Sequence, residues 1–291
     1  MSKLQNDIQD KNFVVTSELN PPKGTDLSLL FNKAELLKNS ITAFNITDNH
    51  TSKMSMSPIA VANLLKEQGI EPIVQLACRD KNRTALQSDI LGISALGIKN
   101  ILCMTGDHSN IGDDPDAKAV FDLNGISLLK AVSSLNRGKD LANNELKGTP
   151  NIFSGAVANP GSSNINKEID RMKEKIEAGA KFFQTQPVYD IRKFELFFNQ
   201  TSDLNIPIIA GHIMLKSADM ADRFNKNIPG VSIPENVIKE LSVTHDRKNK
   251  SSKIAINLIN ELKNMCQGVH LMALGWESLI PNILKTANIK S

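Results

Sequence analysis

The sequence predicts an α/β protein that folds as a single-domain (β/α)8 TIM barrel, and three observations support this prediction. First, residues 72–78 and 99–104 are apolar runs on either side of a segment whose apolar residues recur at spacings near three and four. Second, both runs are too continuously apolar to leave one face in water, which is typical of parallel strands covered by helices. Third, the same alternation recurs along all 291 residues, a length that suits one barrel.

Eight strand candidates follow one another along the chain. They begin near Phe13, Ile41, Pro72, Lys99, Asn151, Lys181, Ile206 and Gly268. Amphipathic helices are expected between and after them, at residues 26–37, 57–68, 86–96, 124–135, 166–178, 191–199, 218–225, 234–241, 252–263 and 277–285. This count and alternation match a closed barrel. A doubly wound open sheet is the alternative, but no GxGxxG phosphate turn follows the first strand.

Two segments stand outside this alternation. The expected domain spans residues 1–291, and residues 1–12 are expected to form a short N-terminal extension before the first strand. Residues 111–120 (IGDDPDAKAV) form a loop rich in glycine, proline and aspartate. It is too long for a simple connection, which indicates a functional role.

The composition excludes several classes of protein. With 41% hydrophobic and 22% charged residues the chain is typical of globular domains. A net charge of +3 without a basic, aromatic-rich stripe gives no reason to expect nucleic-acid binding. The three cysteines, Cys78, Cys103 and Cys266, show neither metal-ligand spacing nor a disulfide framework, so no metal is expected. No signal peptide or membrane-length apolar run is present, which predicts a cytoplasmic protein without membrane contact.

Polar residues cluster where the predicted strands end, and in a parallel barrel these ends converge on one mouth. The set comprises Glu18, Thr47, Asp48, Asn49, His50, Gln75, Arg79, Asp107, Asn159, Gln186, Tyr189 and His212. It holds carboxylates and amides but no serine nucleophile elbow and no HExxH motif. Such a set suits a heterocycle with a donor and acceptor edge, such as a pterin.

Three residues of this set are the main chemical candidates. Asp107 follows Gly106, which allows the backbone to turn near a ligand, although Asp107 equally suits a helix cap. Glu18 lies at a strand end near apolar neighbours, where a raised pKa would suit a general acid. The alternative for Glu18 is an ion pair at the rim with a lysine such as Lys23. The Gln186 amide can pair with a heterocycle edge in a bidentate way.

Taken together, these residues resemble the methylenetetrahydrofolate reductase family, and two motifs look closer to its bacterial branch. The resemblance covers the chain from about Phe13 onward. The matching motifs are Ser17-Glu18-Leu19-Asn20-Pro21-Pro22, Ile46-Thr47, Thr105-Gly106-Asp107, Glu177-Ala178-Gly179-Ala180 and Thr185-Gln186. The two motifs of the bacterial branch are Cys78-Arg79-Asp80-Lys81-Asn82-Arg83, with Leu86-Gln87-Ser88-Asp89 after it, and Phe121-Asp122-Leu123.

The resemblance implies an oxidoreductase of one-carbon metabolism. NAD(P)H would reduce a flavin, FAD in the first instance, and a hydride would then pass to 5,10-methylenetetrahydrofolate to give 5-methyltetrahydrofolate. By position, Glu18 would be the acid, Asp107 would bind and tune the folate and the flavin, and Gln186 would bind the pterin. The implied cofactor contacts are Thr47, Asp48, His50, Gln75, Thr105, Gly106, Asp107, Phe121, Asn159 and Lys175. A homo-oligomer is also expected from the family.

Several positions depart from the best-known members of this family. The departures are Thr105 for an arginine, Gln75 for a histidine, Asp48 for a tyrosine, Gly155 and Asn159 for a tyrosine and a histidine, and Trp276 for an arginine. Most lie on the flavin side, so FMN or no tightly bound flavin is also compatible with the sequence. Two alternatives stay open: a flavin-free or partner-dependent form of the same reaction, and a non-redox pterin-binding methyltransferase with a methyl-accepting partner.

Overall fold

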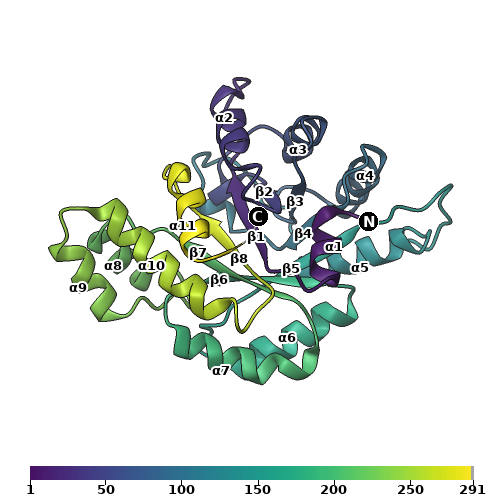
Figure 1. The fold of residues 1–291 in the computed structure, drawn as a ribbon. Coiled ribbons are helices and arrows are strands. Elements are labelled where there is room, and N and C mark those ends of the chain that lie inside the picture. Colours follow the sequence, from purple (N-terminus) through teal and green to yellow (C-terminus); the bar gives the residue numbers. More distant parts are fainter. Residues whose placement is uncertain (290–291) are drawn as a thin grey trace.

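Eight parallel strands close into a barrel in the computed structural model, which describes residues 1–289 (Figure 1). The strands are β1 Val14–Leu19, β2 Ala43–Ile46, β3 Pro72–Ala77, β4 Asn100–Met104, β5 Phe153–Ala158, β6 Phe182–Pro187, β7 Ile208–Ile213 and β8 Gly268–Met272. Each strand pairs with the next in sequence, and β1 also pairs with β8, so the sheet has no free edge. The predicted (β/α)8 barrel is confirmed.

Helices surround the barrel and lie close to their predicted ranges. They are α2 Ser28–Leu37, α3 Pro58–Glu67, α4 Arg83–Ala95, α5 Gly125–Asn136, α6 Ile165–Glu177, α7 Ile191–Thr201, α8 Ala218–Asn227, α9 Glu235–Val243, α10 Arg247–Leu262 and α11 Ile280–Thr286. Short 3-10 turns occur at η1 His50–Ser52, η2 Ser109–Ile111, η3 Ser202–Leu204 and η4 Glu277–Leu279. Polar caps define the starts of several helices, as in α5, where Asn124 and Ser127 form a reciprocal capping box.

Side chains alternate between the inside and the outside of the barrel. Outward residues pack beneath the helices in one large apolar core. Inward residues near the N-terminal ends of the strands fill the half of the barrel opposite the mouth. They are Val14, Ala43, Ile73, Leu102, Phe153, Phe182 and Ile209. Because this alternation has a period of two, it decides which residues near each strand end face the mouth.

An additional helix, α1 Lys3–Gln9, packs against the barrel interior at the N-terminal ends of the strands (Figure 1). Leu4 and Ile8, one helical turn apart, are 0% and 6% exposed and join the interior apolar cluster. Ser2 caps α1, and its hydroxyl donates to the Asn100 side chain at 2.6 Å. Residues 1–12 precede the first strand, and the helix that they form is part of the barrel core.

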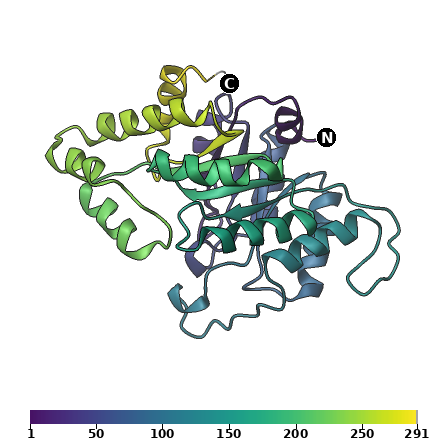
Figure 2. The ribbon, with the colours of Figure 1, turned by 90° about the horizontal axis from the view of Figure 1, so that it is seen from below.

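Between β7 and β8 the chain forms three helices: α8 and α9 project from one side of the barrel, whereas α10 packs on the barrel through Ala255, Leu258 and Leu262 (Figure 2). An apolar cluster of their own, which includes Leu215, Val231 and Leu241, holds them together. No helix among residues 1–289 is both long and apolar enough to cross a bilayer.

Candidate active site

Glu18 faces the mouth of the barrel from the end of β1. It shares the inward side of the strand with Val14 and Thr16, and its side chain is partly buried. Burial raises the pKa of its carboxyl, while the charge of His50 and a hydrogen bond from Asn20 lower that pKa to a smaller extent. This direction is the one expected from the sequence. Glu18 is thus a protonatable carboxyl in a site that opens to solvent.

The alternative role for Glu18, an ion pair with Lys23, is wrong. Lys23 instead binds Asp113 of the loop after β4, with 2.6 Å between Nζ and Oδ2. The neighbour that orients Glu18 is Asn20. Its Oδ1 accepts a hydrogen bond from the Thr47 hydroxyl at 2.8 Å, so its amide nitrogen is the end left for the Glu18 carboxyl.

A layer of hydrogen-bonded polar side chains crosses the barrel interior at the level of Thr16. Gln184 Nε2 donates to the Thr16 hydroxyl at 3.1 Å, and Asn45 Nδ2 donates to Gln184 Oε1 at 2.6 Å. His270 Nδ1 lies 2.9 Å from the same hydroxyl. Burial lowers the pKa of His270 to about 4, so this imidazole is neutral at pH 7. These four residues were not among the predicted site residues, although Asn45 and Gln184 are polar residues inside otherwise apolar strands.

Two glutamines face the same space from other strands. Gln186 is on the inward side of β6, two residues beyond Gln184, and it is exposed at the mouth. Gln75 is on the inward side of β3, like Ile73, and is 8% exposed. The predicted mouth positions of both amides are therefore confirmed, and Gln186 is accessible to a ligand.

Asp107 is exposed at the end of β4, directly after Gly106. Gly106 has a φ of +88°, and a Cβ there would lie 3.1 Å from the Ala77 Cβ, so the turn requires glycine. The alternative that Asp107 caps a helix is wrong, because His108 caps η2 and Asn124 caps α5. Asp107 therefore presents a free carboxylate at the rim.

The predicted cofactor contacts divide into residues that lie at the mouth and residues whose polar atoms bond within the protein. His50 is exposed, Phe121 is half-buried, and Gly106 exposes a turn of backbone at the mouth. Thr105, however, accepts a hydrogen bond from the Gly125 amide at 3.0 Å with its hydroxyl and so stabilises the start of α5. Asp48 points away from the barrel interior, where its carboxylate accepts from the Ala77 amide at 3.1 Å.

Asn159 and Lys175 also make their polar contacts within the protein. Asn159 Nδ2 donates to the Pro229 carbonyl at 3.2 Å and so fixes the loop between α8 and α9. Lys175 is a residue of α6 whose side chain is buried between this helix and β5. Its ammonium donates to the Val157 carbonyl at 2.7 Å. The structure does not bring the Lys175 ammonium to the mouth, because its helix packs on the outer face of β5.

Tyr189 and His212 were predicted at the mouth, and this prediction is wrong. His212 lies on the outer side of β7, where its ring packs edge-on against Tyr189 at 5.1 Å between centroids. The Tyr189 hydroxyl donates to the Ile213 carbonyl at 2.8 Å. Among residues 1–289 no group of histidine, cysteine, aspartate or glutamate is placed to hold a metal ion.

A cavity of about 400 Å³ opens beside Glu18, between the β1 end, α2 and the β8 end. Its walls include Asn20, Leu29, Lys33 and Leu274. On one wall Lys33 binds Glu277, with 2.9 Å between Nζ and Oε1. The cavity is large enough to take an aromatic ring system next to the Glu18 carboxyl.

Comparison with known proteins agrees with this geometry. The family model described as methylenetetrahydrofolate reductase matches residues 3–288 of the chain. The chain belongs to the methylenetetrahydrofolate reductase family. A 5,10-methylenetetrahydrofolate reductase of Buchnera aphidicola is 25% identical over 280 residues, which cover 92% of this chain and 87% of that protein. The probable methylenetetrahydrofolate reductase (NADPH) of Caenorhabditis elegans is 21% identical over 253 residues, and the match spans only 36% of its length.

A solved structure shares the whole fold. It is an uncharacterized protein from Clostridium thermocellum that binds two copies of 5-methyl-5,6,7,8-tetrahydrofolic acid. The two chains align over 99% of each with a TM-score of 0.68 and 18% sequence identity. At this identity the similarity shows the shared barrel fold alone.

Members of the methylenetetrahydrofolate reductase family generally use a flavin and NAD(P)H. The residues at the mouth fit the flavin ring, because Gln75 offers an amide and the Gly106 turn lets backbone approach a planar ligand. The fit to the phosphates is weaker, because Lys175, which the resemblance implies as their contact, instead donates to the Val157 carbonyl between α6 and β5.

Proposed function

We propose that the protein reduces 5,10-methylenetetrahydrofolate to 5-methyltetrahydrofolate, with NAD(P)H as the electron donor and FAD as the cofactor. The observation that supports this most directly is Glu18, a partly buried carboxyl with a raised pKa beside the cavity at the mouth. Membership of the methylenetetrahydrofolate reductase family supports the substrate class. A cytoplasmic location and a homo-oligomeric state are part of the proposal.

In this proposal three side chains act on the folate. Glu18 holds a proton and donates it to N10 of the imidazolidine ring, which opens to a cationic N5 iminium. The exposed Asp107 carboxylate stabilises that positive charge electrostatically. The Gln186 amide pairs with the donor and acceptor edge of the pterin. The iminium then accepts a hydride and becomes the N5-methyl group, while Glu18 is left ionised.

The flavin would supply the hydride chemistry when bound. Gln75 and the Gly106 turn would hold its ring, with His50 and Phe121 at the rim. The remaining predicted contacts, Thr47, Asp48, Thr105, Asn159 and Lys175, make hydrogen bonds within the protein. These internal contacts favour a second candidate function, in which the flavin is weakly held or absent and a partner protein delivers the electrons.

One experiment tests the proposal and separates the candidates. The purified protein is first examined for flavin absorbance, and any chromophore is released by denaturation and identified. Oxidation of NADH and of NADPH is then followed with and without 5,10-methylenetetrahydrofolate. Flavin together with folate-dependent oxidation is the expected result. Folate-dependent oxidation without flavin supports the second candidate, and no folate reduction under either condition would overturn both. Transfer of a methyl group from 5-methyltetrahydrofolate without net oxidation would support the methyltransferase alternative instead.

A further inference from the structure

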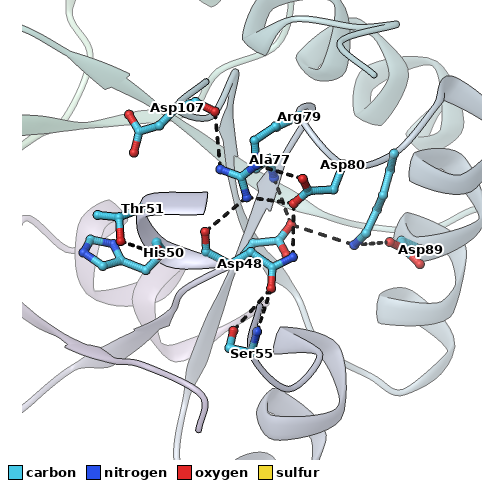
Figure 3. A network of polar contacts seen from close by, with 11 residues as sticks. Asp48, His50, Thr51, Ser55, Ala77, Arg79, Asp80, Asp89 and Asp107 are labelled. Atoms are coloured by element: carbon cyan, nitrogen blue, oxygen red, sulfur yellow. Dashed lines mark hydrogen bonds and ion pairs between the residues drawn. The ribbon is translucent and has the colours of Figure 1, made fainter. Parts of the chain in front are cut away.

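Arg79 and Asp80, just after β3, form an ion pair beside the mouth in which Arg79 is buried and Asp80 is exposed (Figure 3). The Arg79 side chain is 2% exposed, and its Nε and Nη2 atoms donate to the two Asp80 carboxylate oxygens at 2.8 and 2.7 Å. Such a two-point contact fixes the plane of the guanidinium as well as its position. The hydrogen bond to Asp80 raises the pKa of Arg79. Burial raises the pKa of Asp80, but the hydrogen bonds from Arg79 and Asn49 together with nearby positive charges outweigh it and leave this pKa lowered, so both groups remain charged at neutral pH.

The same arginine contacts two other strand-end loops. Nη2 donates to the Asn49 carbonyl after β2 at 3.1 Å, and Nη1 donates to the Asp107 carbonyl after β4 at 3.4 Å. The Arg79 carbonyl also accepts a hydrogen bond from the Val120 amide at 2.7 Å. Arg79 therefore holds both ends of the 107–120 loop, which returns to the place where it began. In Figure 3 the Asp107 carbonyl points toward Arg79 and its carboxylate points away.

The loop after β2 has a backbone conformation that it would not adopt alone. Asn49, Thr51 and Ser52 have φ angles of 44°, 52° and 58°, in the left-handed region that non-glycine residues rarely occupy. A β-branched residue such as Thr51 is strongly disfavoured there, so surrounding contacts must impose the conformation. Asp80 supplies one of these contacts, because its Oδ2 accepts from Asn49 Nδ2 at 3.1 Å.

The two loops also touch each other. Gly112, in the 107–120 loop, lies against the Ser52 carbonyl so closely that any Cβ at Gly112 would clash with it. The relative position of the loops therefore determines where His50 and Asp107, one on each loop, stand at the mouth. A change in the Arg79 contacts would move both at once.

We infer that Arg79, held by Asp80, is a positioning residue that fixes the neighbouring His50 and Asp107 loops relative to each other at the mouth. This inference rests on the proposed folate reduction for its kinetic test. Arg79 would not touch the substrate. Its effect would come through Asp107, which must lie near the iminium carbon in the transition state, where small displacements are costly.

The test compares Arg79→Gln and Arg79→Lys with the control Arg83→Gln. Arg83 makes a similar two-point pair with Asp122, at 2.7 Å from Nη2 to Oδ1, but it is exposed and contacts neither Asn49 nor Asp107. We expect Arg79→Gln to lower kcat for folate reduction about ten- to a hundredfold, because a misplaced catalytic group costs up to that much. Arg79→Lys should keep the positive charge but lose the planar two-point contact, so we expect an intermediate kcat. Arg83→Gln should stay within about twofold of the wild type, as surface pairs contribute little.

A rescue variant separates positioning from mere stability. Thr51→Gly removes the Cβ that disfavours the left-handed backbone, so the loop can hold its conformation with fewer contacts. In the Arg79→Gln background it should restore kcat severalfold. If Arg79→Gln fails to fold, Asp80→Asn provides the same comparison, because it keeps Arg79 and weakens its fixation. Wild-type kcat in a folded Arg79→Gln protein, an equal loss in Arg83→Gln, or no recovery with Thr51→Gly would overturn the inference.

Hydrogen exchange provides a readout that does not depend on turnover. Amides of residues 49–52 and 107–120 should exchange faster in Arg79→Gln than in the wild type, while the barrel strands stay unchanged. If the wild type does not reduce the folate, the proposed function fails, and these exchange rates still decide the positioning role. Equal exchange in both loops would overturn it.

Discussion

Glu18→Gln is the most informative substitution, because it removes only the transferable proton. Glutamine has nearly the same shape and still offers an oxygen to the Asn20 amide, which Thr47 holds in place at 2.8 Å. A positioned general acid typically contributes about 10²- to 10⁴-fold to a rate. We therefore expect folate reduction to fall by roughly that factor, while reduction of any bound flavin by NAD(P)H remains at the wild-type rate.

The same substitution has a predicted effect on stability, and its sign follows from the pKa. Burial raises the pKa of Glu18 in the folded state above 4.5. The folded protein thus keeps this proton at pH values where the unfolded chain has lost it. The stability from Glu18 is complete below about pH 4.5 and is lost as the pH rises through the folded pKa. Each unit of pKa displacement corresponds to about 1.4 kcal/mol, so Glu18→Gln should be more stable than the wild type at pH 8 and gain less at pH 4.

Two assays test this reasoning. Rapid-mixing kinetics follow the reduction of the folate separately from the reaction with NAD(P)H, and urea unfolding at pH 4 and 8 gives the stability. Glu71→Gln is the matched control, since Glu71 is a half-buried carboxyl next to the start of β3, at the opposite end of the barrel, where it accepts from Asn100 Nδ2 at 2.6 Å. Folate reduction by Glu18→Gln within threefold of the wild type would refute the acid role. Equal stability changes at both pH values would refute the burial argument.

Three further predictions follow from the site and the core. Asp107→Asn should slow folate reduction tenfold or more in the same rapid-mixing assay, because the iminium loses a facing charge, and an unchanged rate would contradict this. Burial lowers the pKa of His212 and of His270 to about 4, so the unfolded chain binds protons first as the pH falls from 6.5. The free energy of unfolding, measured with urea, should therefore fall by roughly 2 kcal/mol per histidine between pH 7.5 and pH 5. An equal free energy of unfolding at both pH values would refute the neutral forms. Leu4→Ala should cost about 2–5 kcal/mol in urea unfolding, as expected for a large core side chain, whereas a cost below 1 kcal/mol would mean that α1 is not part of the core.

The barrel could be predicted because its signals are local and repeated. Continuous apolar runs such as Pro72–Ala77 alternate with amphipathic helices such as Arg83–Ala95, and burial on both faces explains the first pattern. The role of α1 was missed because the helix has only seven residues. The spacing of Leu4 and Ile8 was a signal for one buried face, but only the closed barrel shows which surface that face covers.

The site was predicted in part, and most errors come from the two-residue alternation of strands. Glu18 and Gln186 face the mouth because they continue the inward sides of β1 and β6. Asp48 and His212 each adjoin an inward position and therefore point outward. Because both faces of these strands are buried, the apolar pattern alone does not tell inward from outward positions.

Other features of the site depend on contacts that no local pattern encodes. The long Lys175 side chain reaches a carbonyl that is set by how α6 packs on β5. The contacts of Arg79 with the loop after β2 depend on the left-handed backbone of residues such as Thr51. A threonine in the sequence gives no indication of that conformation, because β-branched residues rarely adopt it.

The pairing of β1 with β8 has a consequence for biosynthesis. Val14 and Gly268 are register partners although almost the whole chain lies between them, and Ser17 pairs with Leu271. The strand that carries Glu18 therefore keeps one unpaired edge during translation until the last strand has left the ribosome. An unpaired edge of this kind is a template for association with other chains. We expect a ribosome-bound chain that ends before residue 268 to expose β1 and to bind chaperones, and β1 to be among the last parts of the barrel to be protected.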